Sequence, residues 1–424
     1  MIRILKCGEV DNAEIFARSV PEVDVQKIVS DIIADVRARG DAALYDYCEK
    51  FDRVKLDRLE VSAEEIDEAL RAVEPEFFGI LETAAQNIRQ FHEKQVRNSF
   101  IITERSGVVM GQKVTPMDRV GLYVPGGTAA YPSTVLMDAI PARIAGCREI
   151  VIVTPPGRDG KVNPAILAAA RVAGVDRIFK VGGAQAVAAL AWGTESIPCV
   201  DKIVGPGNAF VAEAKKQVFG RVAIDMIAGP SEILIVADGK SNPVHVAADL
   251  LSQAEHDKLA SAVLVTDSMD LAKAVQAEVE RQVRLLPRVE IASASIDKNG
   301  KIIVADTLDK AIDIANALAP EHLELCVDNP FDYLDKVKHA GSIFMGRYCP
   351  EALGDYLAGP NHTLPTGGTA RFYSPLSVDD FVKKSQYTYF TRDALSAVSD
   401  KIARFARKEG LEGHARSVES RFCK

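Results

Sequence analysis

The chain has 424 residues, of which 47% are hydrophobic and 26% are charged, and its formal net charge at pH 7 is −8. This length predicts two or more domains with ample core, and the composition is that of an ordinary globular protein. The acidic balance argues against a dedicated nucleic-acid binder, because phosphate contacts need a basic face.

The cysteines and the apolar segments bear on the cell compartment. None of the seven cysteines belongs to a CxxC pair, and an odd number argues against a disulfide framework. The first ten residues, MIRILKCGEV, contain no sustained apolar run of the kind a signal peptide needs. Prolines and glycines interrupt the stretch 121–137, which is therefore no membrane span. We expect a soluble cytoplasmic protein with no membrane partner, in which a metal ion would have nitrogen and oxygen ligands.

The first quarter of the chain is predicted to be helical behind a short arm. Residues 1–25 are expected to form a separate N-terminal arm. Apolar residues then recur at helical spacing in 25–33, 63–72 and 77–91. Two segments rich in β-forming residues follow, at 100–104 and 107–115.

Short apolar runs alternate with helical patterns from residue 120 to residue 235, which predicts a parallel sheet covered on both faces. The expected strands are 120–124, 149–153, 177–181, 202–204 and 232–237. The expected helices are 134–145, 165–173, 184–191 and 208–218. Glycine-rich turns follow three of the strands, in VPGGT, VGGAQ and VGPGN, and such turns can present backbone N–H groups to phosphate. No GxGxxG occurs, so the usual dinucleotide-binding motif is absent.

A second alternating block predicts a second sheet of the same kind. Its expected strands are 262–266, 301–305, 322–327 and 342–345, and its expected helices are 271–283 and 308–317. The fold class is therefore α/β, with two incomplete Rossmann-like parallel-sheet domains. We assign 26–116 with 236–320 to the first domain and 117–235 with 321–372 to the second. Residues 373–424 are expected to form a charged helical tail, which has no core of its own and must dock on its own body or on a second subunit.

One predicted helix carries a polar flank. Asn242 is a suitable N-cap and Pro243 a suitable first residue, so a helix is expected through about His256. Gln253 and His256 are three residues apart, so an amide oxygen and an imidazole nitrogen can face one cation. They share the flank with His245, Asp249 and Ser252, while Val244, Ala247, Ala248, Leu251 and Ala254 form the opposite, apolar flank. On these residues alone, a solvated helix face is the favoured interpretation.

Four further groups could carry chemistry, and each also has an ordinary structural explanation. Glu321-His322 pairs a carboxylate with an imidazole at the edge of a strand, although such pairs also occur by chance. The polar residues of the glycine- and proline-rich loop that contains Asp355 and His362 could be turn formers. The tail segment from Glu409 to His414 could be a helix end, and Ser231 could be a turn residue. The joint occurrence of these groups favours a functional site.

The chain resembles the histidinol dehydrogenase family over nearly its whole length. The segments that carry the resemblance are GLYVPGGTAAYPST, VGGAQAVAALAWGT, VDKIVGPGN, AGPSE, LSQAEHD, PEHLEL, GDYLAGPNHTLPT and EGLEGHA. The resemblance implies zinc ligands at Gln253, His256, Asp355 and His414, and a catalytic pair at Glu321 and His322. It implies substrate contacts at Ser231, Gln253, His256, His322, Asp355, His362, Glu409 and His414, and cofactor contacts at Tyr123, Gln185 and Asn208.

The resemblance also implies an activity and an assembly. Family members oxidise L-histidinol to L-histidine, the last step of histidine biosynthesis, with one zinc ion per subunit and two NAD. Their tail crosses to the second subunit of a homodimer, so that the active sites are shared. Two other interpretations stay open: a related branch that oxidises another amino alcohol or diol, and a zinc-dependent binding protein without catalysis. Zinc-dependent hydrolysis is disfavoured because no HExxH pairing is present.

Overall fold

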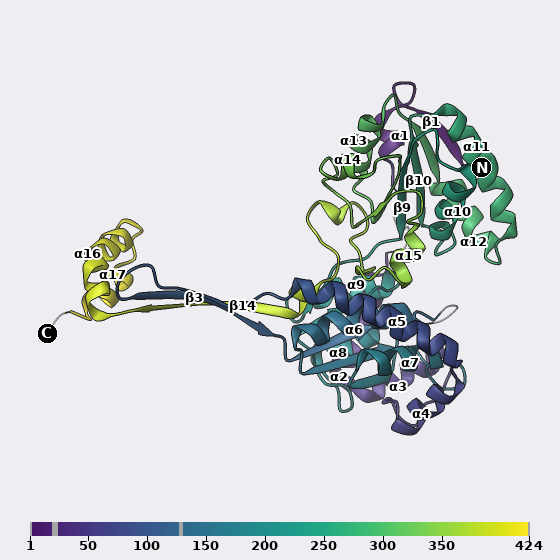
Figure 1. The fold of residues 1–424 in the computed structure, drawn as a ribbon. Helices are drawn as coiled ribbons and strands as arrows, with labels where there is room; N and C mark the ends of the chain where they lie inside the picture. Colours follow the sequence, from purple (N-terminus) through teal and green to yellow (C-terminus); the bar gives the residue numbers. More distant parts are fainter. Residues whose placement is uncertain (1, 19–23, 127–129, 423–424) are drawn as a thin grey trace. The chain divides into compact units, whose positions relative to one another are not determined.

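The computed structural model describes residues 2–18, 24–126 and 130–422. The chain divides into two compact units, one made of Met1–Gln95 with Met117–Phe381 and the other of Val96–Pro116 with Val382–Lys424. The larger unit contains two parallel sheets with helices on both faces (Figure 1). The predicted α/β class with two Rossmann-like sheets is confirmed.

The first parallel sheet follows the order β6-β5-β4-β7-β8. Its strands are β4 (Arg119–Tyr123), β5 (Glu149–Thr154), β6 (Arg177–Lys180), β7 (Lys202–Val204) and β8 (Ala223–Ile224). Numbered along the chain this is 3-2-1-4-5, the doubly wound Rossmann order without its sixth strand. The strands follow one another through α6 (Pro132–Ala145), α7 (Pro164–Ala173), α8 (Gly183–Trp192) and α9 (Ala209–Val218). Such crossovers are what parallel pairing requires.

The N-terminal helices cover this same sheet. They are α2 (Gln26–Arg39), α3 (Asp41–Tyr47), α4 (Ala63–Ala72) and α5 (Pro75–His92), with short helical turns at Cys48–Asp52 and Glu93–Gln95. α2 and α3 share one core with α8 and α9, whereas α4 and α5 share another with α6 and α7. Alternate residues of β5 point into the two cores, Val151 into the first and Ile152 into the second, as the two-residue period of a strand requires.

The second parallel sheet has the order β1-β11-β10-β9-β12-β13. Its strands are β1 (Arg3–Lys6), β9 (Glu232–Ala237), β10 (Ser261–Thr266), β11 (Lys301–Val304), β12 (His322–Cys326) and β13 (Ser342–Met345). From β9 onward the order is again 3-2-1-4-5, and β1 adds one strand at the edge. Figure 1 shows α10 (Pro243–Ala254) and α12 (Val289–Asn299) on one side of it and α13 (Leu308–Leu318) and α14 (Phe331–Leu334) on the other. α1 (Asn12–Phe16), α11 (Met269–Gln282), α15 (Glu351–Tyr356) and the short turns Val283–Leu285, Thr369–Arg371 and Val378–Phe381 complete the unit.

The sheets correct the expected domain boundaries. Residues 26–92 pack on the sheet of 119–224, not with 236–320, and β12 and β13 pair with the strands that begin at Glu232. The expected separate arm is also wrong where it is described: Arg3–Lys6 joins the sheet beside β11, because the apolar Ile2 and Leu5 are buried there. Residues 1 and 19–23 of that arm lie outside the described residues.

The predicted helix with the polar flank is α10, and its start is confirmed. Asn242 caps the helix by accepting a hydrogen bond from Val244 N at 2.9 Å, and Pro243 is its first residue. The helix ends at Ala254, two residues before the expected end, so His256 lies just beyond it. The predicted exposure of the two flanks is wrong in part. Gln253, on the flank expected to be solvated, is fully buried, whereas Val244, on the apolar flank, is 41% exposed.

The C-terminal end is helical, as expected, but a strand precedes its helices in the smaller unit. β14 (Val382–Phe390) runs antiparallel to β3 (Val108–Pro116), which also pairs with β2 (Phe100–Ile102). The long β3–β14 ribbon leads to α16 (Arg392–Lys408) and α17 (Glu412–Glu419), which pack on each other (Figure 1). Their shared core consists of Ala403, Ala406 and Ala415. Among the described residues of the whole chain, no helix is long and apolar enough to cross a membrane.

Candidate active site

Glu321 and His322 stand at the start of β12, where the chain turns from α13 into the sheet. The turn is made by Ala319, whose φ of 46° ends the helix in a left-handed conformation, and by Pro320. Ser342 N donates a hydrogen bond to Glu321 O at 2.9 Å, which fixes the turn against β13. The exposed fraction of Glu321 is 7% and that of His322 is 4%. Both titratable groups are therefore held in the interior at the amino ends of the strands.

The hydrogen bonds of His322 define its tautomer. Its Nδ1 lies 2.9 Å from the backbone oxygen of Glu232, and a carbonyl oxygen can only accept, so Nδ1 carries the hydrogen. Nε2 is buried and has no hydrogen-bond partner among the described residues. Burial lowers the pKa of His322, which favours the neutral ring. Nε2 is consequently a lone-pair acceptor that faces a buried space.

Glu321 lies beside this ring, and its pKa is shifted in the opposite direction. Its Oε2 accepts a hydrogen bond from Glu232 N at 2.8 Å and is 3.7 Å from His322 Nδ1. Burial raises the pKa of Glu321 well above its usual value, and the carboxylates of Glu232, Asp355 and Glu351 raise it further. Raised pKa values of this kind are common for carboxyl groups that act in acid–base catalysis.

The buried side-chain amide of Gln253 indicates a ligand-binding site. Its side chain is fully buried, and neither its amide oxygen nor its amide nitrogen has a hydrogen-bond partner in the described residues. Burying unsatisfied polar atoms costs about 1–3 kcal/mol. His256 N donates to Gln253 O at 3.2 Å, and a charge on His256 acts on the pKa values of both His322 and His362. His256 therefore lies near both of these histidines and directly after the helix that carries Gln253.

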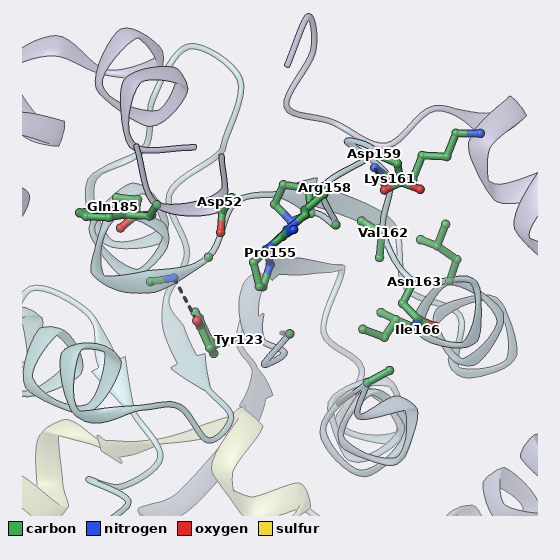
Figure 2. A pocket seen from close by; sticks show the side chains of 18 of the residues that line it. Asp52, Tyr123, Pro155, Arg158, Asp159, Lys161, Val162, Asn163, Ile166 and Gln185 are labelled. Atoms are coloured by element: carbon green, nitrogen blue, oxygen red, sulfur yellow. Dashed lines mark hydrogen bonds between the residues drawn. The ribbon is translucent and has the colours of Figure 1, made fainter. Parts of the chain in front are cut away.

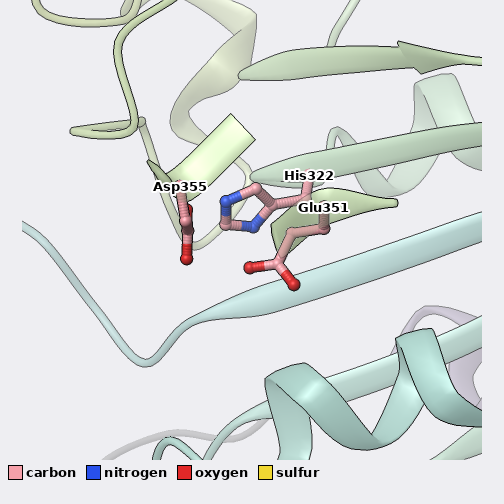
Figure 3. A group of neighbouring side chains, drawn as sticks. All are labelled: His322, Glu351 and Asp355. Atoms are coloured by element: carbon pink, nitrogen blue, oxygen red, sulfur yellow. The ribbon is translucent and has the colours of Figure 1, made fainter. Parts of the chain in front are cut away.

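Three side chains form a group that could hold a metal ion (Figure 3). One ligand atom each from His322, Glu351 and Asp355 lies within 4.8 Å of the others. Burial raises the pKa of Asp355, and the carboxylate of Glu351 raises it further. His362 Nδ1 is 3.7 Å from Asp355 Oδ1, and burial lowers the pKa of His362 to about 4. Neutral imidazoles and crowded carboxylates are the donor set that zinc takes with nitrogen and oxygen ligands.

Sequence reasoning missed Glu351. It lies four residues before Asp355 on α15, so the two carboxylates share a helix face. The sequence signal was this spacing, which was hidden because residues 330–372 read as turns. Asp249, which had no predicted role, lies near the same group: burial raises its pKa to about 6, and the carboxylate of Glu351 acts in the same direction. His245, by contrast, is exposed.

Ser231, Glu409 and His414 complete the predicted set. Ser231 immediately precedes β9 and accepts a hydrogen bond from Ser261 N at 3.0 Å through its backbone oxygen, so it too lies at the amino edge of the sheet. Glu409 ends α16 and His414 lies in the first turns of α17, both in the smaller unit and both exposed. The larger unit alone thus brings together Ser231, Gln253, His256, Glu321, His322, Asp355 and His362.

The predicted cofactor residues line a cavity of about 1180 Å³ (Figure 2). Tyr123 Oη accepts a hydrogen bond from Gly183 N at 3.0 Å. Asn208 Oδ1 caps α9 by accepting from Phe210 N and Val211 N at 3.0 and 3.2 Å. Gln185 is buried in the wall. Tyr123 is the last residue of β4, and Gln185 and Asn208 follow β6 and β7, so the cavity lies at the carboxyl ends of the first sheet, at its switch in strand order. Gly127 and Thr128 of the expected VPGGT turn lie outside the described residues.

The family model of histidinol dehydrogenase matches residues 17–422 of the chain. The chain belongs to the histidinol dehydrogenase family. It is 55% identical to the histidinol dehydrogenase of Clostridium acetobutylicum, with 100% of this chain and 99% of the relative covered. It is 58% identical to that of Geobacillus kaustophilus, with 94% of each covered. The crystal structure of histidinol dehydrogenase from Elizabethkingia anophelis matches with a TM-score of 0.94 at 41% identity, covering 99% of this chain and 98% of that one.

The likeness extends through both units. The matched range contains all the residues expected from the resemblance to histidinol dehydrogenase, from Tyr123 to His414. A member of this family is an oxidoreductase of histidine biosynthesis. The geometry adds the tautomer of His322 and the unsatisfied amide of Gln253, which no sequence match contains.

Proposed function

We propose that the protein oxidises L-histidinol to L-histidine through L-histidinaldehyde, a four-electron reaction with two NAD as acceptors, in the cytoplasm. The observation that carries the proposal is the buried Glu321-His322 pair, in which His322 Nε2 has no hydrogen-bond partner among the described residues and burial raises the pKa of Glu321 well above its usual value. The chemistry needs both functions. Loss of an alcohol proton accompanies the first hydride transfer, and addition of water precedes the second.

His322 is assigned the first role. Its Nε2 accepts the proton of the alcohol while hydride leaves the adjacent carbon for NAD. The Nδ1–H group, held at 2.9 Å by the backbone oxygen of Glu232, keeps the ring in the correct tautomer and stabilises the imidazolium that forms. This arrangement needs no movement of the ring.

Glu321 is assigned the second role. Assisted by His322, it removes a proton from the water that adds to the aldehyde, and the resulting hydrate loses hydride to the second NAD to give the carboxylate. Its hydrogen bond from Glu232 N holds one oxygen. The same backbone residue therefore orients both members of the pair.

Zinc fits the remaining donors. Gln253, His256 and Asp355 would hold the ion together with His414, and the support for this is the buried Gln253 amide without a partner next to crowded carboxylates. When bound, zinc supplies a Lewis acid that anchors the substrate. His362 and Glu409 are suited to the imidazole ring and the ammonium group of histidinol, together with Ser231.

NAD is assigned to the cavity in Figure 2, through Tyr123, Gln185 and Asn208. Its volume lies slightly above the usual range for ligand pockets, which suits a large dinucleotide. The exchange of the tail between the subunits of a homodimer is supported by the small core of α16 and α17 and by the exposed Phe405 and Leu411, 69% and 42% accessible, which a partner could cover.

The deciding experiment measures the NADH formed per histidinol consumed. We expect two NADH per histidinol, with no free aldehyde accumulating, and abolition of turnover by a chelator. One NADH per histidinol would mean an ordinary alcohol dehydrogenase. Faster turnover of another amino alcohol would favour the related branch, and no NADH at all would favour a binding protein.

A further inference from the structure

Glu351 is a buried carboxylate with one oxygen still unused. The residue is 2% exposed. Its Oε2 accepts a hydrogen bond from Ser252 Oγ at 2.7 Å, whereas its Oε1 is buried and has no partner among the described residues. Ser252 directly precedes Gln253, so this hydrogen bond fixes the carboxylate beside the end of α10. The anchored oxygen leaves the other one in a defined position.

The surroundings of Glu351 contain further carboxyl groups. One of its carboxylate oxygens lies within 4.8 Å of a ligand atom of His322 and of Asp355, and Figure 3 shows the carboxylate beside the histidine ring, with Asp355 at the ring's other side. In the part of the chain that the structure describes, no lysine or arginine forms an ion pair with Glu321, Glu351 or Asp355. Buried charges of one sign without a counterion are strongly unfavourable. A cation that touches more than one of these carboxyl groups would compensate their charges.

We propose that Glu351 is a further ligand of the metal ion, beside Asp355, in the enzyme before substrate binds. This inference rests on the zinc site of the proposed function and adds a residue to it. Gln253 and the histidine ligands are neutral, so Asp355 alone would leave a divalent cation with one uncompensated charge. A second carboxylate makes the site neutral, and an oxygen at this distance reaches an ion that Asp355 also reaches.

The test compares E351Q with E324Q in the full-length protein. Glu324 is the matched control, because it is equally buried, and its Oε1 is occupied by the backbone N–H of Glu351 at 2.8 Å. Each variant replaces one carboxyl group with an amide of nearly the same shape. Zinc affinity is measured without substrate or NAD, by competition with a chromophoric chelator and by elemental analysis. The cobalt-substituted proteins are compared by visible absorption, which reports the ligands directly.

We expect E351Q to bind zinc about 10- to 100-fold more weakly than wild type, which is the usual effect of removing a group around a metal site. The visible spectrum of its cobalt-substituted form should also differ from that of wild type. E324Q keeps an amide oxygen as acceptor for Glu351 N, so its zinc affinity should stay close to that of wild type, with an unchanged spectrum. Where E351Q fails to fold, E351D takes its place: it keeps the charge but shortens the reach, and it should also alter the cobalt spectrum.

Three results would overturn the inference. The first is unchanged zinc affinity and an unchanged spectrum in E351Q. The second is an equal loss of affinity in E351Q and E324Q, which would mean that Glu351 acts only through the electric field. The third is normal zinc binding with weakened histidinol binding, which would assign Glu351 to the substrate ammonium. Wild-type protein that binds no zinc would contradict the proposed function as well, so the two failures are distinguishable.

Discussion

Substitution of Lys215 by methionine should destabilise the larger unit and loosen the loop that carries Asn208. Lys215 and Asp225 form a buried ion pair, each with a side chain 2% exposed. Lys215 Nζ also donates to Gly205 O at 2.9 Å, while Asp225 accepts from Gly205 N at 2.8 Å. The ion pair thus binds both the backbone carbonyl and the backbone N–H of Gly205, in the turn between β7 and α9.

The magnitude follows from what K215M leaves behind. The variant buries the Asp225 carboxylate without its counterion, a change that costs about 3–5 kcal/mol. At about 2–4 °C per kcal/mol for a domain of 150–250 residues, the melting temperature should fall by roughly 6–20 °C. The turn has little room to adapt, because Gly205 has a φ of +109° and an added Cβ there would lie 2.2 Å from Tyr123 O. We therefore also expect weaker NADH binding by K215M at a temperature where the protein is still folded.

The assay is a double-mutant cycle with K215M, D225N and K215M/D225N, followed by calorimetry and by NADH fluorescence. The amide introduced by D225N keeps one acceptor for Gly205 N without the charge, so the double variant should be more stable than the sum of the two single changes predicts, by about 0.5–3 kcal/mol. A loss of less than about 1 kcal/mol in K215M, or strict additivity, would show that the reasoning from a buried charge is wrong.

Three further predictions concern the catalytic pair, the tail and a buried histidine. His322→Asn should slow both oxidation steps by a factor of about 10²–10⁴, whereas Glu321→Gln should slow mainly the oxidation of added histidinaldehyde. Equal effects of both variants on each step, measured as NADH formation, would contradict these roles. Mixing His414→Ala chains with His322→Ala chains should restore part of the activity, since one site of each heterodimer would be intact under tail exchange; proven heterodimers without activity would exclude the exchange. Burial lowers the pKa of His92 to about 4, so the folded state resists protonation: this contribution is complete above pH 6.5 and is lost as the pH falls toward 4. At 1.36 kcal/mol per pKa unit the loss between pH 7 and pH 5 is about 2 kcal/mol. His92→Gln should lack it, and equal acid sensitivity of the two proteins in urea denaturation would count against the assignment.

The local elements could be predicted because each is encoded in its own stretch of chain. Apolar runs bounded by glycine turns located β4, β5, β6 and β7 to within about a residue, and Asn242-Pro243 located the start of α10. Sheet membership could not be predicted in this way, because strand order is decided by long-range packing that a local pattern does not contain. The helices of residues 26–92 precede the sheet that they cover, and their periodicity does not indicate which of the two sheets that is.

The site was predicted unevenly for the same reason. Family motifs named Gln253, His322 and Asp355, whereas periodicity alone placed Gln253 on a solvated face. Its burial depends on α15, a short helix hidden in a turn-rich segment, and Glu351 was missed with that helix. The tautomer of His322 depends on the backbone oxygen of Glu232, ninety residues away, and only the folded chain brings these two atoms together.

The two sheets share one strand order but use opposite edges, and the edges differ in electrical polarity. At the carboxyl edge of the first sheet, α8 and α9 begin, and helix N-termini carry partial positive charge. At the amino edge of the second sheet, α10 ends beside Gln253, and helix C-termini carry partial negative charge. The end of α13 at that edge already attracts a cation, since Arg371 donates to Ala317 O at 2.7 Å. One strand order, with a site proposed at opposite edges of the two sheets, would thus give the proposed NAD site a partial positive charge that suits a pyrophosphate and the proposed metal site a partial negative charge that suits a cation.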